Sequence, residues 1–401
     1  MMRFIFIAAL FFFLMDKNDT VPVLETGSEK PMPNEWIDKD TQHRIIKLSR
    51  RDGDSRSFYF HNNPFIHQTG DEGDLMVFYG EVDSLRQLFT VNMKTFEITR
   101  LTNHGNQIRG EIVAPERREV FYQSNDSVFA TNVDTQTPRL VYVFPEDFKA
   151  GVTTLNSNET LLAGSYADPV KDEIYKKNPD KSSYFNLIYE AKIPHTLFTL
   201  NIETGKLNKI YSERAWLNHI QFSPTDPNLL MYDHEGPWHK VDRIWTIDVT
   251  TGKNQLMHER EMDMEIAGHE FFSRDGKTIW YDLQKPRGET FFLAGVDIKT
   301  GKKKLYEMDR NEWSIHFNQS PDQALFAGDG GDPTQVAHAE DGEWLYLFTP
   351  KGNRLESEKL VNMQHHGYRP LEPNVHFSPD GKWIIFRSDF DGEVNIYAVE
   401  I

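Results

Sequence analysis

The chain of 401 residues contains no cysteine at all. Disulfide bonds, thiolate metal sites and cysteine nucleophiles are therefore excluded, and the stability of the fold has to come from packing. Basic residues are also in the minority, since 44 Lys and Arg stand against 61 Asp and Glu and leave a formal net charge of −17. Nucleic acids are bound by basic surfaces, so this charge argues against a nucleic-acid partner.

Several catalytic signatures and long apolar runs are missing as well. The sequence has no Gly-x-Ser-x-Gly, no His-Glu-x-x-His, no phosphate-binding loop and no dinucleotide fingerprint. One apolar run, Phe4 to Met15, follows Arg3 at the N-terminus, and no other stretch is apolar enough for a membrane span. Because this run is too short to cross a bilayer, we expect residues 1–20 to be a signal peptide for export to the periplasm or medium of a bacterium. A buried N-terminal segment is the alternative.

What the sequence does contain is an internal repeat. Turns of the form Asp/Asn-x-x-Thr-Gly end at Gly205, Gly252 and Gly301, with weaker copies at Thr95 and Thr135. Successive threonines of these turns lie 40, 69, 47 and 49 residues apart, and one four-stranded propeller blade takes about 40–50 residues. The aromatic content of 13% also suits many short, packed strands. The spacing therefore predicts a β-propeller.

A second repeated unit, Phe-Ser-Pro-Asp-Gly or a variant of it, sets the number of blades. Its turn residues separate two apolar, alternating stretches, as expected for two paired strands. Clear copies begin at Phe222, Phe272, Gln319 and Phe377, and degenerate copies lie near Phe65, Val113 and Leu155. We therefore predict an all-β fold in which residues 21–401 form one seven-bladed propeller. The strand His43 to Leu48 is expected to complete the last blade and close the ring, which removes exposed edge strands.

The longest step of the repeat contains an insertion of about residues 165–193 in the third blade. It is rich in Lys, Tyr, Asp and Pro. We expect it to be either a lid over one face of the propeller or a solvated loop. No amphipathic helix of useful length stands out here or elsewhere in the chain.

The repeat also gives a register for the residues that line the central channel. The innermost strand of each blade begins three residues before the phenylalanine of the unit. The residues at this position are His219, His269, His316 and Asn374 in blades four to seven, and Asn62 (beside His61), Gly110 (beside Arg109) and Val152 in blades one to three. Imidazoles that converge there can bind a metal or act as acid and base. Alternatively, they form hydrogen bonds between blades and only hold the ring together.

Two loops add candidates outside this register. The segment from Asp233 to Arg243 is dense in acidic, basic and aromatic groups and includes His234 and His239. Such a loop is typical of a ligand site, although a structural ion-pair network is the alternative. Arg369 precedes the last blade and is expected to overhang the same mouth of the channel.

Several of these segments resemble the oligogalacturonate lyase family. They are Tyr59 to Asn63, His234 to Pro237, Gly268 to Phe271, Gly328 to Gly330 and Phe377 to Asp380, and the likeness runs from about Trp36 to the C-terminus. The resemblance implies a seven-bladed propeller that splits short pectic fragments by β-elimination with a divalent metal, manganese in the type. In that family the metal neutralises the uronate carboxylate and so acidifies the C5 proton, which a basic residue removes.

The resemblance also implies roles for single residues. His269 matches a metal ligand of the family, and Arg369, Glu372 and Asn374 stand where the family has a glutamine and two histidines. Oxygen donors at Glu372 and Asn374 would make calcium an alternative to manganese. Arg369 would alternatively pair with the uronate carboxylate itself. His219 falls where the family has a channel histidine that we take for the proton abstractor.

We therefore predict a polysaccharide lyase for uronate-containing, pectin-like oligosaccharides. The catalytic candidates are His219, His234, His316 and His61; the substrate-binding candidates are Arg109, Arg369, His239, Asn62 and His376; the metal-binding candidates are His269, Glu372 and Asn374. One alternative is a non-catalytic periplasmic scaffold or glycan-binding propeller. Another carbohydrate-active enzyme on the same fold is the second alternative, and a glycosidase would need two carboxylates on either side of the bond.

Overall fold

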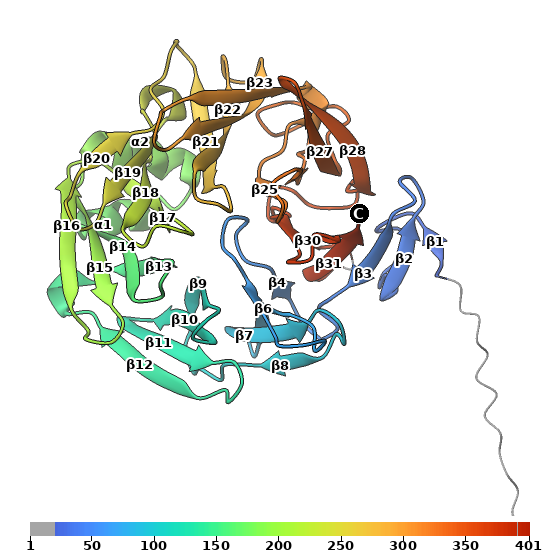
Figure 1. Ribbon diagram of the computed structural model, residues 1–401, viewed down its shortest axis with the longest axis horizontal. Helices are drawn as coiled ribbons and strands as arrows, with labels where there is room; N and C mark the ends of the chain where they lie inside the picture. Colours follow the sequence, from blue (N-terminus) through green and yellow to red (C-terminus); the bar gives the residue numbers. More distant parts are fainter. Residues whose placement is uncertain (1–20, 391) are drawn as a thin grey trace, which may run out of the picture.

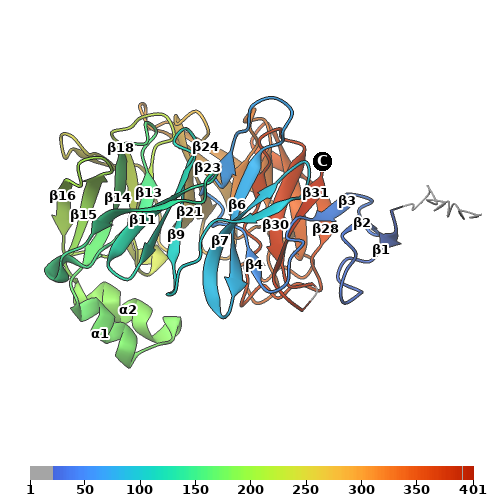
Figure 2. The same cartoon turned by 90° about the horizontal axis from the view of Figure 1, so that it is seen from below.

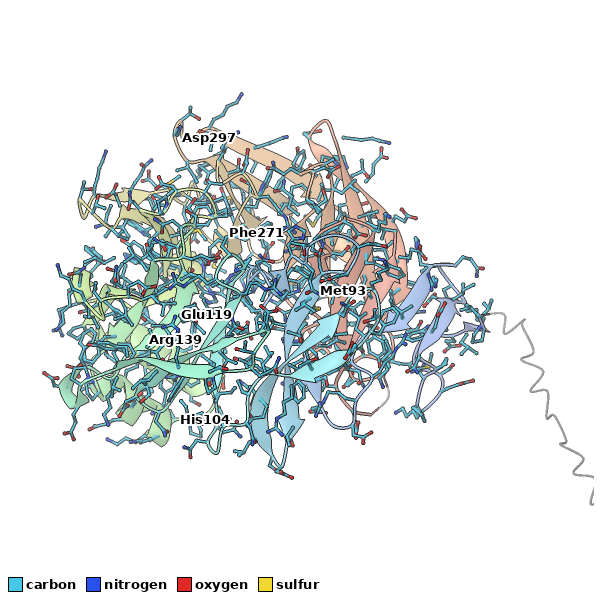
Figure 3. All side chains as sticks on the ribbon, turned by 60° about the horizontal axis from the view of Figure 1, so that its bottom comes forward. Met93, His104, Glu119, Arg139, Phe271 and Asp297 are labelled. Atoms are coloured by element: carbon cyan, nitrogen blue, oxygen red, sulfur yellow. The ribbon has the colours of Figure 1, made fainter. Side chains whose placement is uncertain are left out.

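The computed structural model describes residues 21–390 and 392–401, and these residues form a closed ring of β-sheets around a central channel (Figure 1). There are six sheets, one of which joins two blades, so the ring has seven blades. Within each blade the strands are antiparallel and the innermost strand lies beside the channel. Figure 3 labels Phe271 of an innermost strand near the middle of the ring and Asp297 on an outer turn. The all-β propeller expected from the repeats is confirmed.

The strands follow the chain around the ring. Blades one to three contain β4 (Ser55–Arg56), β5 (Phe65–Ile66), β6 (Leu75–Val82), β7 (Leu85–Asn92), β8 (Ile98–Arg100), β9 (Arg109–Ala114), β10 (Glu119–Ser124), β11 (Ser127–Asn132), β12 (Pro138–Val143), β13 (Gly151–Leu155), β14 (Leu161–Ala167), β15 (His195–Asn201) and β16 (Leu207–Glu213). Blades four and five contain β17 (Leu217–Phe222), β18 (Leu229–His234), β19 (Ile244–Asp248), β20 (Asn254–Leu256), β21 (Ile266–Phe272), β22 (Thr278–Gln284), β23 (Phe291–Asp297) and β24 (Lys303–Met308). Blade six contains β25 (Phe317–Gln319), β26 (Phe326–Gly328), β27 (Trp344–Lys351) and β28 (Arg354–Asn362). Short 3-10 turns cover Glu146–Phe148, Trp238–Lys240 and Arg310–Glu312.

The last blade is built from both ends of the described chain. It contains β29 (His376–Phe377), β30 (Trp383–Ser388) and β31 (Asn395–Glu400), and β3 (Arg44–Lys47) pairs antiparallel with β31. The expected closure by an N-terminal strand is confirmed. Two further strands, β2 (Glu35–Asp38) and β1 (Val23–Leu24), extend this sheet outward to six strands. Pairing across the closure covers the edge of β31 that an open ring would expose.

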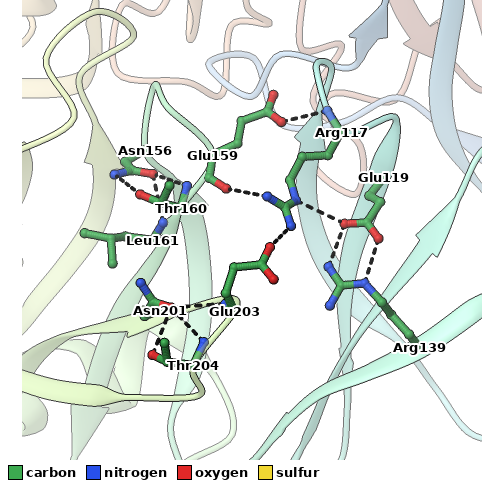
Figure 4. Close-up of polar contacts among 10 residues, drawn as sticks. All are labelled: Arg117, Glu119, Arg139, Asn156, Glu159, Thr160, Leu161, Asn201, Glu203 and Thr204. Carbon is green, nitrogen blue, oxygen red and sulfur yellow. Dashed lines mark hydrogen bonds and ion pairs between the residues drawn. The ribbon is translucent and has the colours of Figure 1, made fainter.

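The Asp/Asn-x-x-Thr-Gly repeat has a simple physical cause. In the copy at Asp248, the side-chain Oδ1 accepts hydrogen bonds from the backbone N–H groups of Thr250 (2.9 Å) and Thr251 (2.8 Å). The next residue, Gly252, has a φ of 72°, which glycine adopts without strain. Figure 4 shows the equivalent turn at Asn201. The side chain thus closes the turn between the two outer strands of a blade.

Neighbouring blades are also fastened by charge, as Figure 4 shows for blades two and three. Arg139 donates two hydrogen bonds of 2.7 Å to the two carboxylate oxygens of Glu119. Arg117 bonds to Glu119 in its own blade and to Glu203 in the next blade. Glu159 of blade three accepts the backbone N–H of Arg117 at 2.8 Å. These contacts stabilise the seam in addition to the packed apolar side chains.

The insertion in blade three contains the two α-helices of the described residues, α1 (Val170–Lys177) and α2 (Lys181–Ala191). They form a hairpin that lies against one face of the ring (Figure 2). The expectation that this region has no helix was wrong. The helices could not be recognised from the sequence, because α1 buries none of its residues and α2 buries Ile188 alone, so neither shows a clear apolar stripe. No helix of the described part of the chain is long and apolar enough to cross a membrane. The signal peptide expected in residues 1–20 lies outside the described residues.

Candidate active site

Two cavities occupy the central channel. One, of about 460 Å³, lies where β17 and β21 begin, and it is lined by His219 and His269. The other, of about 440 Å³, lies where the same strands end. His61 and Asn62 line both cavities and therefore stand between them. The first cavity is large enough for a small ligand, since ligand sites take about 300–1,000 Å³, and it holds more of the chemically active side chains. We call it the histidine cavity.

Bulges in the inner strands aim side chains at the histidine cavity. The pairing of β17 with β18 shifts between Asn218 and Gln221, and that of β21 with β22 shifts between Gly268 and Phe271. His219 and His269 lie inside these shifts with φ values of 44° and 52°. Non-glycine residues rarely adopt a positive φ, and such strain is concentrated at functional sites. The register inferred from the repeat therefore leads to positions where the inner strands are distorted, and His219 and His269 are two of them.

A buried arginine organises the acidic wall of the cavity. Arg243 forms ion pairs with Asp233, with Glu235 (2.9 Å) and with Glu270 (3.0 Å), and its side chain is 4% exposed. Burial lowers the pKa of Arg243, but the three carboxylates outweigh it and hold the pKa well above the ordinary value. Arg243 is therefore a permanent cation whose charge is already matched.

His219 contacts the same wall. Its Nε2 lies 3.4 Å from a carboxylate oxygen of Glu235. Burial lowers the pKa of His219, but the negative charge of Asp233 and the hydrogen bond to Glu235 raise it further, so the net shift is upward. An imidazole with a raised pKa is a stronger base once it has lost its proton.

His269 and His316 both carry nitrogens without hydrogen-bond partners. The Nδ1 of His269 and the Nε2 of His316 are buried and have no hydrogen bond to another described residue. The two rings pack edge to face with their centres 4.9 Å apart. Burial, followed by the charge of His316, lowers the pKa of His269 well below its ordinary value, so this imidazole is neutral. Buried polar atoms normally have partners, so these two nitrogens are candidates for a bound ion.

Glu372 and Asp329 hold His316 from its two sides. Asp329 contacts its Nδ1 at 2.8 Å, and a carboxylate oxygen of Glu372 lies 3.8 Å from its Nε2. Glu372 lines the histidine cavity, and its side chain is 45% exposed. The carboxylate of Glu372 is therefore open to a ligand, whereas that of Asp329 is buried behind the imidazole.

A loop that reaches into the middle of the ring separates the two cavities (Figure 1). Tyr59 in this loop packs against the rings of His219, His61 and His316 at 6.2, 5.1 and 5.0 Å. Its backbone N–H donates to Glu111 at 2.6 Å, and Asn62 donates to the same carboxylate oxygen at 3.0 Å. Burial raises the pKa of the Tyr59 phenol well above its ordinary value, so Tyr59 keeps its proton.

Two of the catalytic candidates differ strongly in position. His61 lines both cavities, and burial, followed by the charge of His219, lowers its pKa to about 3, so it is neutral. His234 does not line either cavity, because its Nε2 lies 3.1 Å from Glu213 and its ring stacks on Trp245 at 5.1 Å. His234 therefore packs between blades three and four.

The predicted substrate contacts are scattered. Asn62 lines both cavities, and His376 lines the second cavity, where its two nitrogens contact the backbone oxygens of Asn374 and Asn62. Arg109, Arg369 and His239 line neither cavity. Arg369 is exposed and donates to Thr334 at 3.2 Å.

Asn374, a predicted metal ligand, is fully buried and its amide is already used. The side-chain oxygen accepts the backbone N–H of Phe60 at 2.9 Å, and the nitrogen donates to the backbone oxygen of Glu372 at 3.1 Å. Its φ of 53° shows the same distortion as the two channel histidines. In this arrangement Asn374 positions the central loop.

Sequence reasoning did not assign a role to several residues of the histidine cavity. These residues are Tyr59, Lys181, Trp238 and Arg243 on the lining, and Glu270 behind it. Arg243 and Trp238 lie in the charged loop that the sequence singled out, and Glu270 follows His269 directly. Lys181 lies in the insertion and could be connected with the cavity only from the fold.

Nearly the whole chain is similar to known oligogalacturonate lyases. A model of the oligogalacturonate lyase family matches residues 32–401. An oligogalacturonate lyase of Dickeya dadantii is 26% identical over 91% of this chain and 95% of its own length, and an oligogalacturonide lyase of Pectobacterium atrosepticum is 25% identical over 94% and 98%. An oligogalacturonate lyase structure in complex with manganese has a TM-score of 0.78 at 23% identity, with 92% of this chain and 95% of that chain covered. The corresponding enzyme of Vibrio parahaemolyticus has a TM-score of 0.77 at 24% identity, with 92% and 96% covered.

Proposed function

The chain belongs to the oligogalacturonate lyase family, and from this premise we propose how its own residues cleave the substrate. It is a lyase of uronate-containing oligosaccharides that derive from pectin. The observation that carries the proposal is the pairing of His219 with Glu235 at the lining of the histidine cavity, 3.4 Å apart. An imidazole that carboxylates make more basic suits the removal of a weakly acidic C–H proton.

We propose that His219 removes the C5 proton of the uronate sugar whose C4 carries the glycosidic oxygen of the broken linkage. The electrons of that C–H bond form a double bond between C4 and C5, and the bond from C4 to its glycosidic oxygen breaks. Tyr59 lines the same cavity and holds a proton, and we assign to its phenol the protonation of the departing oxygen, which is strongly basic once the C4–O bond breaks. No water is consumed, and one product carries an unsaturated ring.

Charge on the intermediate has to be stabilised, because the carboxylate of the substrate takes up negative charge as the proton leaves. The similar structure contains manganese, and this chain offers side-chain donors of the kind that such an ion binds. His269 and His316 offer unpartnered, buried nitrogens, and Glu372 adds an open carboxylate, a donor set that suits a divalent transition metal. When bound, a divalent ion neutralises the uronate carboxylate and makes the C5 proton more acidic.

A second group of possible ligands is more compact, but its charge environment fits a cation less well. His219, Asp233 and Glu270 are the one trio within the described residues whose ligand atoms lie within 4.8 Å of one another. Arg243 already pairs with Asp233 and Glu270, so an added cation would lie against a guanidinium. We therefore assign the metal to His269, His316 and Glu372.

A glycosidase on the same fold is the main alternative, and the products distinguish the two reactions. We expect the masses of the two products to sum to the mass of the oligogalacturonate, because elimination adds no water. A sum that exceeds it by one water molecule would indicate hydrolysis and would contradict the proposal. Two free carboxylates are needed for hydrolysis, and Glu235 is already held by Arg243 and His219.

We also propose that the enzyme is exported, on the basis of the basic and apolar character of residues 1–20. Mass spectrometry of the N-terminus of protein recovered from a bacterial periplasm tests this. Removal of the apolar run is expected, and an intact N-terminus on protein from the cytoplasm would contradict it.

A further inference from the structure

The histidine cavity contains two cations, and one of them is already neutralised. Arg243 pairs with three carboxylates, Asp233, Glu235 and Glu270, and is buried. Lys181, the first residue of α2, also lines the cavity. It is exposed, and its ammonium lies 5.8 Å from the centre of the Phe185 ring on the same helix. Within residues 21–390 and 392–401 no ion pair with a carboxylate is formed by Lys181. Lys181 is therefore the cation of this lining whose charge no described carboxylate matches.

The helical hairpin holds Lys181 in a defined place. Phe185 of α2 packs on Trp216 with ring centres 5.5 Å apart, and Ile188 is buried in the same apolar cluster. Tyr189 packs so closely on Gly236 that a β-carbon there would lie 2.5 Å from its ring. The hairpin therefore rests on the loop that carries Glu235 and Trp238, both of which line the cavity.

A second anchor lies on α1. Lys171 contacts the buried His195 of β15 at 3.2 Å, and its ammonium lies 4.7 Å from the centre of the Trp216 ring. These contacts join the hairpin to the strand that follows it in the chain. Because both helices are fixed to blades three and four, Lys181 is presented to the cavity by a packed element and not by a free loop.

An oligogalacturonate carries one carboxylate on every sugar, whereas the reaction at His219 involves the carboxylate of one sugar. In a chain with a net charge of −17, a further carboxylate in the cavity needs a local cation. We propose that Lys181 binds the carboxylate of a sugar next to the one that loses its proton, so that the hairpin selects uronate chains with free carboxylates. This rests on the proposed function of the cavity.

The first test compares Lys181→Ala and Lys181→Arg with Lys176→Ala, a lysine on α1 that does not line the cavity. With a de-esterified trigalacturonate we expect Lys181→Ala to raise KM by about three- to tenfold, as for one exposed charge contact, while kcat changes little. Lys181→Arg should restore KM, and Lys176→Ala should leave it unchanged. On a methyl-esterified trimer the effect of Lys181→Ala should disappear.

The absence of cysteine allows a sharper test. In Lys181→Cys the one thiol of the chain can be modified with an aminoethyl methanethiosulfonate, which restores a positive charge, or with a sulfonatoethyl one, which adds a negative charge. We expect the first reagent to lower KM toward the wild-type value and the second to raise it further. Lys176→Cys treated in the same way is the matched control and should not respond.

The outcomes separate this inference from the function on which it rests. Suppose that the wild type cleaves trigalacturonate but KM does not respond to the charge at position 181. This result would overturn the role of Lys181 and leave the proposed function intact. Equal effects at positions 176 and 181 would also overturn it, because they would show general surface electrostatics. A wild-type enzyme that is folded and inactive would instead contradict the proposed function.

Discussion

His219 faces Glu235 at the inner end of blade four, with Nε2 3.4 Å from the carboxylate oxygen. The positive φ of His219 turns its side chain out of β17 and into the cavity. Glu235 directly follows β18, the strand that pairs with β17. Glu235 is in turn fixed by Arg243. The proposed base, His219, is therefore positioned by a bulge and by a buried ion-pair network, both of which belong to the propeller framework.

We expect His219→Gln to lower kcat by about 10²- to 10⁴-fold, the usual range for loss of a general base. His234→Gln is the matched control, since His234 packs between blades against Glu213 and Trp245. Rates of elimination on trigalacturonate measure both. Similar activity in His219→Gln and the wild type would assign proton removal to another group.

The rise of kcat/KM on the acidic side of its pH profile should follow the deprotonation of His219. Its pKa is raised, so the imidazole is protonated and inactive as a base below that pKa and becomes active as pH rises through it. We expect kcat/KM to increase with pH through a value above the ordinary histidine range of about 6.5. Glu235→Gln removes a cause of the shift and should move the rise to lower pH. A rise that stays in place in Glu235→Gln would contradict this assignment.

Metal binding can be measured without activity. Titration of metal-free protein with manganese, followed by the paramagnetic resonance of the free ion, should show one site. Neutral substitutions His269→Gln and Glu372→Gln are expected to weaken binding by about 10-fold or more, as for loss of a coordinating or supporting group. His234→Gln should bind like the wild type. Unchanged affinity in both ligand variants would place the ion elsewhere.

Arg243 is expected to be a major contributor to stability. Removing it leaves three carboxylates buried together, and breaking a buried ion pair costs about 3–5 kcal/mol. Arg243→Met should therefore unfold at clearly lower denaturant concentration. Arg354→Met is the control, since Arg354 forms exposed ion pairs with Glu307 and Asp309, and exposed ion pairs contribute little to stability. Equal losses in the two variants would contradict the account of Arg243.

The seam between blades two and three should weaken in acid. Burial raises the pKa of Glu119, but Arg139 and Arg117 outweigh it, so the net pKa is lowered. Its contribution is therefore present above the ordinary carboxyl pKa and is lost as pH falls through the lowered one. Glu119→Gln should destabilise the protein by about 1 kcal/mol at neutral pH, with a smaller difference in acid. A difference that does not depend on pH would show that the ion pairs do not act this way.

The fold could be predicted because its repeats have local causes. Asp248 and its equivalents close turns through their own side chains, and these turns recur once in each of blades one to five. The register that follows from the repeats located His219 and His269 in one cavity. Ring closure by the strand before the first blade followed from the incomplete last blade and is seen in the pairing of Ile45 with Val399.

The rest of the site depends on tertiary contacts that no local pattern contains. Arg109 and Arg369 are cations in suitable parts of the sequence, yet neither lines a cavity. Lys181 does so because a hairpin with almost no buried residues packs against one face of blades three and four, and such helices leave no apolar stripe to recognise. His234 is close in sequence to Glu235, but it packs against Glu213 while Glu235 lines the cavity.

The most direct measurement is the ultraviolet absorbance of a conjugated, unsaturated uronate when the purified protein is mixed with oligogalacturonate. The absorbance should rise with the wild type and rise far more slowly with His219→Gln. When a chelator removes divalent ions, the rate of the increase should become low, and added manganese should restore it. A folded wild-type protein that produces no such rise would contradict the assignment of β-elimination to the histidine cavity.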